Sequence, residues 1–206
     1  MKTTMMLAFL LCAVVACTGP VHVAKTDSEG IRSVYQDPEL SELSQRYQPI
    51  LKEIYQRYQA AGIDIYPNGI GFTSVLDQDG KKHPYLLVQV RPRNIMFGEV
   101  QTKPKERFAE VYRRHFEQNL RLMKAGDLRD GVDGLAFGVY WPVRDLSQCD
   151  TYGGFLEYTL IYFPKNDFID LAARNMTFSE AVENAEVVTS LDRKPAAAIK
   201  ITEVDQ

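Results

Sequence analysis

The chain has 206 residues, and its 24 basic and 27 acidic side chains give a formal net charge of −3 at pH 7. This length suits one globular domain with a sizeable core. The near-neutral charge, without a basic block, excludes the electrostatic footprint of a nucleic-acid-binding protein. No apolar run reaches the length of about 20 residues that a membrane-spanning helix needs.

An uninterrupted apolar run, residues 5–16, follows Lys2 at the N-terminus. The run is too short to span a bilayer. It fits the apolar region of a secretory signal peptide, which is about 7–15 residues long and follows a short positive segment. We therefore predict that residues 1–16 are a signal peptide. The alternative is a buried N-terminal helix.

The end of this run, Val14-Val15-Ala16-Cys17, resembles the lipobox of bacterial lipoproteins. The resemblance implies cleavage before Cys17 and attachment of a diacylglyceride to its sulfur, so that membrane lipid holds the protein. In enterobacterial lipoproteins an Asp after the Cys usually retains the protein at the inner membrane. Thr18 stands there in this chain, which favours the outer membrane, with the domain facing the periplasm. An ordinary signal peptide stays open as an alternative, because Val14 and Ala16 also suit general signal peptidase.

The remaining cysteines offer no disulfide. Cys12 leaves with the signal peptide and Cys17 is lipidated in this interpretation, so that Cys149 has no intramolecular partner. A lone thiol of this kind is usually buried and inert. Residues 17–36 are polar, with Gly, Pro and Ser, and are predicted to form the lipidated N-terminus and a flexible tether. Residues 37–206 are then a single domain.

The first predicted helix begins after Asp37, which can cap it, and Pro38 occupies the first helical position. Apolar residues follow at three- and four-residue spacing as far as Tyr58. Pro49 lies inside this pattern and predicts a kink or a break. Gly62 fits a left-handed cap after the helix.

Alternating signals of strands and helices continue to the C-terminus. A second amphipathic helix is predicted over residues 104–125, and short helices are predicted near residues 167–173 and after Thr177, which forms a capping box with Glu180. Strand patterns cover residues 70–76, 85–91, 134–141, 154–163, 186–191 and 197–201. This order predicts an α+β fold: a mostly antiparallel sheet of about four to six strands, covered on one face by two main helices.

The chain lacks the common signatures of catalysis and metal binding. His22, His83 and His115 do not have the spacing of a zinc-binding helix, and there is no Cys-His cluster. Gly-x-Ser-x-Gly, Ser-x-x-Lys and a Gly-rich phosphate loop are absent. The acidic clusters at residues 77–79 and 127–133 are interpreted as a turn and a helix exit, because neither has the ligands of a calcium loop. We therefore predict neither a metal nor a cofactor.

The best candidate for a functional site is the segment from Tyr140 to Gly154, which contains the only tryptophan. Loops between strands often carry binding residues, and Tyr, Trp and Arg are enriched at interface hot spots. Two arginines at the end of an earlier strand could receive an anionic group at the same end of the sheet. The candidate residues are Trp141, Arg144, Asp145, Tyr152, Arg91 and Arg93. The alternative is that Trp141 is a core aromatic and that Arg144 and Asp145 form a surface ion pair.

The anchor and the missing catalytic motifs together predict a cell-envelope lipoprotein whose domain binds or helps to assemble an envelope protein complex. Whether the protein is an enzyme stays open, although the missing motifs favour a protein that is not an enzyme. One alternative is a lipid-anchored periplasmic hydrolase with a site between Trp141 and Asp150. Another is a small-ligand receptor that uses the same loop with Arg91 or Arg93.

Overall fold

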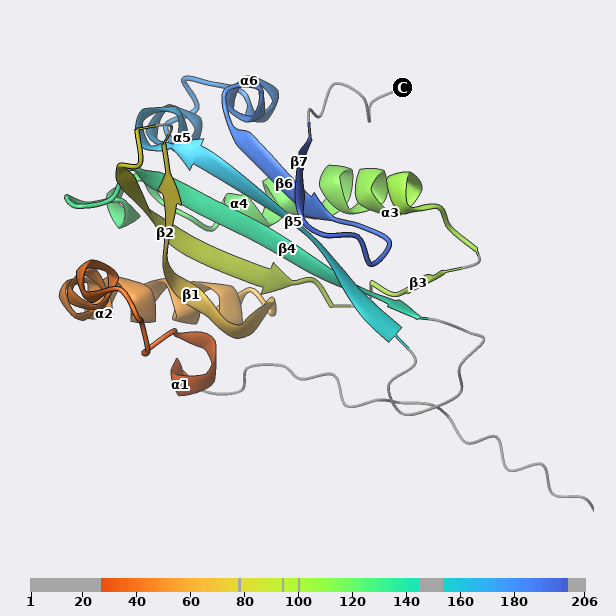
Figure 1. Ribbon diagram of the computed structural model, residues 1–206, viewed down its shortest axis with the longest axis horizontal. Coiled ribbons are helices and arrows are strands. Elements are labelled where there is room, and N and C mark those ends of the chain that lie inside the picture. The colour runs from red at the N-terminus through yellow and green to blue at the C-terminus, as the bar shows by residue number, and fades with distance from the viewer. Residues whose placement is uncertain (1–26, 78, 94, 100, 145–153, 200–206) are drawn as a thin grey trace, which may run out of the picture.

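The computed structural model describes residues 27–77, 79–93, 95–99, 101–144 and 154–199 (Figure 1). The predicted signal peptide, Cys17 and the first part of the predicted tether lie outside these residues, as do Cys149 and the candidate residues Asp145 and Tyr152. In the part of the chain that is described, no helix has both the length and the apolar character needed to cross a bilayer.

Helices and strands follow one another in roughly the predicted order. The helices are α1 (Asp27–Gly30), α2 (Pro38–Ala60), α3 (Pro104–Val111), a π-helical turn (Tyr112–Phe116), α4 (Glu117–Leu120), a 3₁₀ turn (Ala125–Asp127), α5 (Lys165–Ala172) and α6 (Phe178–Glu183). The strands are β1 (Asp64–Leu76), β2 (Lys82–Arg91), β3 (Phe97–Gly98), β4 (Gly134–Arg144), β5 (Gly154–Pro164), β6 (Glu186–Ser190) and β7 (Ala197–Ile199).

The strands form one sheet in the order β1-β2-β4-β5-β6-β7, and the short β3 pairs with β4. Neighbouring strands are antiparallel, except that β2 and β3 both run parallel to β4. The parallel β2–β4 pair follows from the connection between the two strands, because a chain that returns through α3 and α4 can start its next strand in the same direction. The predicted α+β fold with a mostly antiparallel sheet is confirmed.

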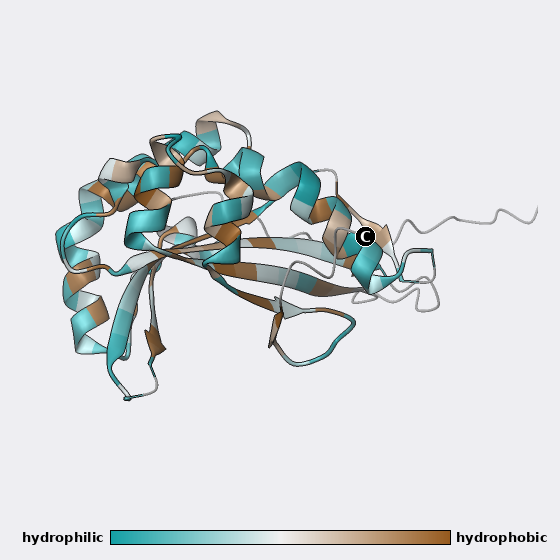
Figure 2. Cartoon of the chain, turned by 90° about the horizontal axis from the view of Figure 1, so that it is seen from above, coloured by the Kyte–Doolittle hydropathy of each residue, from teal (hydrophilic) through white to brown (hydrophobic). Residues whose placement is uncertain are grey.

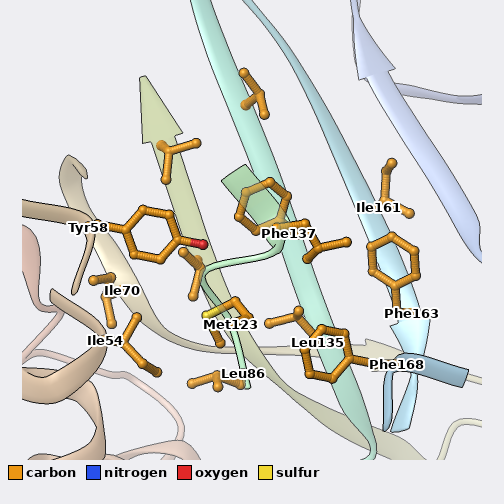
Figure 3. Close-up of a cluster of buried hydrophobic side chains, with 14 of the residues drawn as sticks. Ile54, Tyr58, Ile70, Leu86, Met123, Leu135, Phe137, Ile161, Phe163 and Phe168 are labelled. Carbon is orange, nitrogen blue, oxygen red and sulfur yellow. The ribbon is translucent and has the colours of Figure 1, made fainter. Parts of the chain in front are cut away.

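Among the described residues, the helices gather on one side of the sheet (Figure 2), and on its other side Arg32 and Tyr35 lie against Gly71 of β1. The hydrophobic core lies between the helices and the sheet. Ile54 and Tyr58 of α2 belong to the same buried cluster as Phe137 of β4 and Phe163 of β5 (Figure 3). The hydroxyl of Tyr58 is buried as well, and it donates a hydrogen bond of 2.9 Å to the backbone carbonyl of Asn119.

Helix α2 begins and ends as its sequence indicates. The Asp37 carboxylate accepts a hydrogen bond of 3.0 Å from the backbone N–H of Glu39, and Gly62 has a positive φ of 71° just after the helix. The break that Pro49 predicts is not found, because the helix runs unbroken from Pro38 to Ala60. Pro49 lies on the exposed side of the helix, as does Gln45 one turn earlier. Water can therefore reach the carbonyl that loses its helical partner.

The second predicted helix is wrong as a single element, because a π-helical turn separates α3 from α4. Val111 and Phe116 are both fully buried although they are five residues apart, which is the spacing of a π-helical turn. A regular α-helix would bury His115 instead. His115 is half-buried, whereas Phe116 takes the core position.

The last part of the predicted tether belongs to the domain. Ile31 is 5% exposed, lies in the core cluster and pairs with Ile70 at the free edge of β1. The backbone N–H of Phe72 donates to the hydroxyl of Tyr35 at 3.1 Å. The folded unit therefore begins about ten residues before the predicted boundary at residue 37, because these side chains cover the first strand of the sheet.

Candidate functional site

The two faces of the sheet are chemically different. Side chains alternate between the faces along each strand, and in β4 and β5 one set packs under the helices. The other set points to the side opposite the described helices and is mostly half-exposed. We call this set, together with its neighbours on β1 and β2, the tyrosine face. Its members are Tyr66, Tyr85, Tyr140, Leu156, Tyr158, Leu160 and Tyr162.

Three tyrosines form a continuous stack across this face. The ring of Tyr140 lies 4.3 Å from that of Tyr66 and 5.0 Å from that of Tyr158, and both pairs are stacked. Tyr66 reaches over β2 because the β1–β2 register shifts between Ile65 and Ile70, a bulge that lifts the chain out of the regular pairing. A T-shaped pair, Tyr85 and Tyr162, lies further along the sheet, with its ring centroids 5.5 Å apart.

Glycines in β4 let the large side chains lie close to the backbone. A Cβ atom at Gly138 would come within 2.6 Å of Leu160, and one at Gly134 would come within 2.5 Å of the Tyr85 ring. The side chain of Gln89 lies in the same layer and donates a hydrogen bond of 2.9 Å to the hydroxyl of Tyr140. Burial raises the pKa of Tyr140 above its ordinary value, so the hydroxyl stays protonated and neutral.

The end of the face near the C-termini of β2 and β4 is both apolar and basic. Leu156 is 40% exposed and pairs in register with Pro142, and Met96, in the chain just before β3, is 54% exposed. Arg91 and Arg144 are the last residues of β2 and β4, so that both lie at this end. Among the described residues that point to this side of β4, β5 and β6, the only carboxylate is Glu186, which pairs with Tyr162 towards the opposite end. On β1, Asp64 pairs in register with Arg91.

Trp141 is in the core and not on the surface. It is 0% exposed, and its indole N–H donates a hydrogen bond of 2.8 Å to the carboxylate of Glu157. The same carboxylate accepts two hydrogen bonds from Arg107, at 2.6 and 2.8 Å, and one from the backbone N–H of Asp192 at 2.7 Å. The alternative interpretation, in which Trp141 is a core aromatic, describes this position.

The other predicted residues fall into three groups. Arg91 and Arg144 lie at the same end of the sheet, as expected from the sequence. Arg93 pairs with Asp64 at 2.6 Å and, like His115, lines a surface depression. Asp145, Tyr152 and Cys17 lie outside the described residues, so the structure does not place them.

Carboxylates of the acidic clusters at residues 77–79 and 127–133 form hydrogen bonds or ion pairs with His83 and Arg57. Asp77 and Asp133 both accept from His83, at 3.0 and 2.8 Å, and these hydrogen bonds raise the pKa of the imidazole. Asp127 pairs with Arg57 at 2.6 Å. Within the described part of the chain, no group of three His, Cys, Asp or Glu side chains could hold a metal ion.

Sequence reasoning did not single out the tyrosine face, although β5 contains a signal for it. Leu156, Tyr158, Leu160 and Tyr162 recur at every second position, which is the period of one strand face. The signal is weak because the intervening positions include Glu157 and Thr159, and polar residues there suggest an exposed side. The structure shows that both are fully buried.

The fold and this site define an α+β domain with one helix-covered sheet face and a tyrosine-rich face opposite it. Comparisons with protein-family models, with curated proteins and with solved structures found no match.

Proposed function

We propose that the protein is a lipid-anchored lipoprotein of the bacterial cell envelope whose domain binds an envelope partner protein through the tyrosine face. The observation that carries the proposal is the stack of Tyr66, Tyr140 and Tyr158 on the sheet face opposite the described helices. The resemblance of the residues around Cys17 to a lipobox supports the anchor, and Thr18 supports the outer membrane.

The chemistry of the face favours a protein partner with apolar and acidic side chains. Tyrosine and arginine are the residue types most enriched at protein interfaces. Leu156 offers apolar surface on the same strand face as Tyr158, and Arg91 and Arg144 add positive charge at the same end of the sheet. A partner that brings carboxylates to this end would be complementary in charge, which sets register and specificity.

The anchored position adds to this proposal. Residues 18–26 separate Cys17 from α1, and nine residues span at most about 30 Å when fully extended. The domain would therefore act close to the membrane that holds it. The hydrolase alternative stays a prediction, since most of its site would lie in residues 145–153, outside the described range.

Site-specific photocrosslinking in living cells tests the proposal. A photoreactive amino acid is placed in the full-length chain either at Leu156, on the tyrosine face, or at Leu76, at the tip of the β1–β2 hairpin. Both side chains are exposed, at 40% and 62%, so they form a matched pair. We expect one envelope protein to be captured from position 156 and not from position 76. Equal capture from both positions, or adducts of position 156 with lipid or a second copy only, would contradict the assignment.

A variant of the tyrosine face, with its control, and a variant of the anchor test the two parts of the proposal separately. Tyr158→Asp should lower capture from position 156 by about tenfold or more, because an unpaired charge in a buried contact costs more than 1.4 kcal/mol, whereas Leu76→Asp should leave it unchanged. Cys17→Ala should abolish fatty-acid labelling and membrane retention. If Cys17→Ala is still labelled, the lipobox interpretation is wrong, whatever the crosslinking result.

A further inference from the structure

A surface depression lies on the helix-covered side of the molecule, away from the tyrosine face. Its volume is about 310 Å³, which is at the lower limit for small-molecule sites. Three segments meet around it: the exit of α2, the end of β2 and the helical segment from the π turn to α4. The side chains that line it include Ile63, Pro92, Arg93, His115, Gln118 and Asn119.

The π-helical turn creates one wall of this depression. The turn lets Phe116 enter the core five residues after Val111, and His115 is thereby left at the rim, where it lines the depression. π-Helical turns cost helix stability and are frequent at functional sites. The distortion is therefore a second observation, besides the hollow itself, that points to a ligand.

Each of the four polar side chains around the depression has at least one hydrogen-bond donor. Arg93 uses Nε and Nη2 to bind Asp64, at 2.9 and 2.6 Å, and among the described residues its Nη1 has no partner. Asn119 is 4% exposed, and its Nδ2 has no hydrogen-bond partner either. Burial lowers the pKa of His115, so that at neutral pH the imidazole is uncharged and offers one N–H. Gln118 adds a second side-chain amide.

We propose that this depression binds the carboxylate group of a small organic acid, with Arg93, His115, Gln118 and Asn119 as the groups that surround it. A carboxylate supplies the acceptors that the unused donors lack, and a buried donor without a partner is destabilising. Asp64 already balances the charge of Arg93, which favours a monoanion over a phosphate dianion. The apolar side chains of Ile63 and Pro92 would contact the carbon skeleton of the acid.

This site is independent of the proposed partner surface and can be tested separately. The full-length protein in detergent, labelled with ¹⁵N, is titrated with acetate and with N-acetylglycine, and in parallel with inorganic phosphate and chloride. We expect saturable chemical-shift changes at the His115 ring and at the Asn119 side-chain amide with the two carboxylates. Absence of saturation, or equal saturation by phosphate or chloride, would overturn the proposal.

Matched variants locate the binding. Arg93→Met should weaken carboxylate binding by about tenfold or more, since a charge-assisted hydrogen bond is stronger than one between neutral groups. Arg121→Met, which also removes a salt-bridged arginine but lies on an exposed helix surface, should have no effect. Because loss of Arg93 leaves Asp64 without its partner, Gln118→Ala provides a second variant that leaves this pair intact. Wild-type affinity in both Arg93→Met and Gln118→Ala would contradict the assignment.

Discussion

Two charged residues, Arg107 and Glu157, lie in the core of this protein, whose other buried side chains are mostly apolar. Arg107 and Glu157 are both 0% exposed, and they bind each other through two hydrogen bonds. Trp141 completes the arrangement through its indole N–H. Such a pair adds little net stability over an apolar pair, but it is costly to break, because one partner alone is a buried, uncompensated charge.

We expect Glu157→Gln to lower the free energy of unfolding by about 3–5 kcal/mol, because Arg107 stays charged without its counter-charge. Glu117→Gln, in an exposed pair with Arg121, should change it by less than about 0.5 kcal/mol. Urea denaturation followed by tryptophan fluorescence measures both. The double variant Arg107→Met/Glu157→Leu should be more stable than Glu157→Gln. A small effect of Glu157→Gln would show that water or another group compensates Arg107.

At the scale of the elements, strand β4 organises the sheet. It pairs with β2, β3 and β5, its one face builds the core, and its other face is lined with small residues, Gly134, Ala136 and Gly138. The large side chains of the neighbouring strands lie across these small residues. The close packing of Tyr85 and Leu160 on the tyrosine face therefore depends on Gly134 and Gly138 of β4.

Gly138→Ala tests this role of β4. The added methyl group would meet Leu160 at 2.6 Å and Gln89 at 3.3 Å, and overpacking of this kind costs about 1–3 kcal/mol. Gly126→Ala is the control, because a Cβ there meets nothing within 4 Å. Thermal denaturation should show a lower midpoint for Gly138→Ala and no decrease for Gly126→Ala. If the two variants melt alike, the face can accommodate a methyl group and the packing argument fails.

At the scale of the whole molecule, residues 27–35 mark where the folded domain begins. Ile31 and Tyr35 contact the first strand, through the pairing with Ile70 and the hydrogen bond from Phe72. Arg32 adds a hydrogen bond to Ile70 from its backbone N–H at 2.7 Å. These contacts cover the free edge of β1, and exposed sheet edges tend to pair with other chains.

Two deletions of equal length test this boundary in the chain that lacks the signal peptide. Removal of residues 27–35 should lower the free energy of unfolding by about 2–4 kcal/mol, since the deletion takes the buried Ile31 out of the core. Removal of residues 18–26 should leave the free energy of unfolding unchanged. Equilibrium denaturation in urea distinguishes the two outcomes. Equal stability of both deletions would mean that residues 27–35 do not contribute to the fold.

Local sequence signals determined most of the elements of this protein. Asp37 and Gly62 marked the ends of α2, the acidic residues at 77–79 marked the turn between β1 and β2, and Thr177 with Glu180 marked the start of α6. These signals work because a cap or a tight turn is settled by hydrogen bonds and backbone conformations within a few residues. The α+β class followed from the order of the elements in the same way.

Contacts between distant residues determined the rest. The five-residue step from Val111 to Phe116, the burial of Trp141 beside Glu157, and the stacking of Tyr66 on Tyr140 each depend on neighbours from other elements. A strand pattern cannot say which of its two faces the helices will cover when polar residues occupy the buried one. The sequence by itself thus determined most of the elements and a candidate anchor, whereas only the tertiary structure decided which face of the sheet the helices cover.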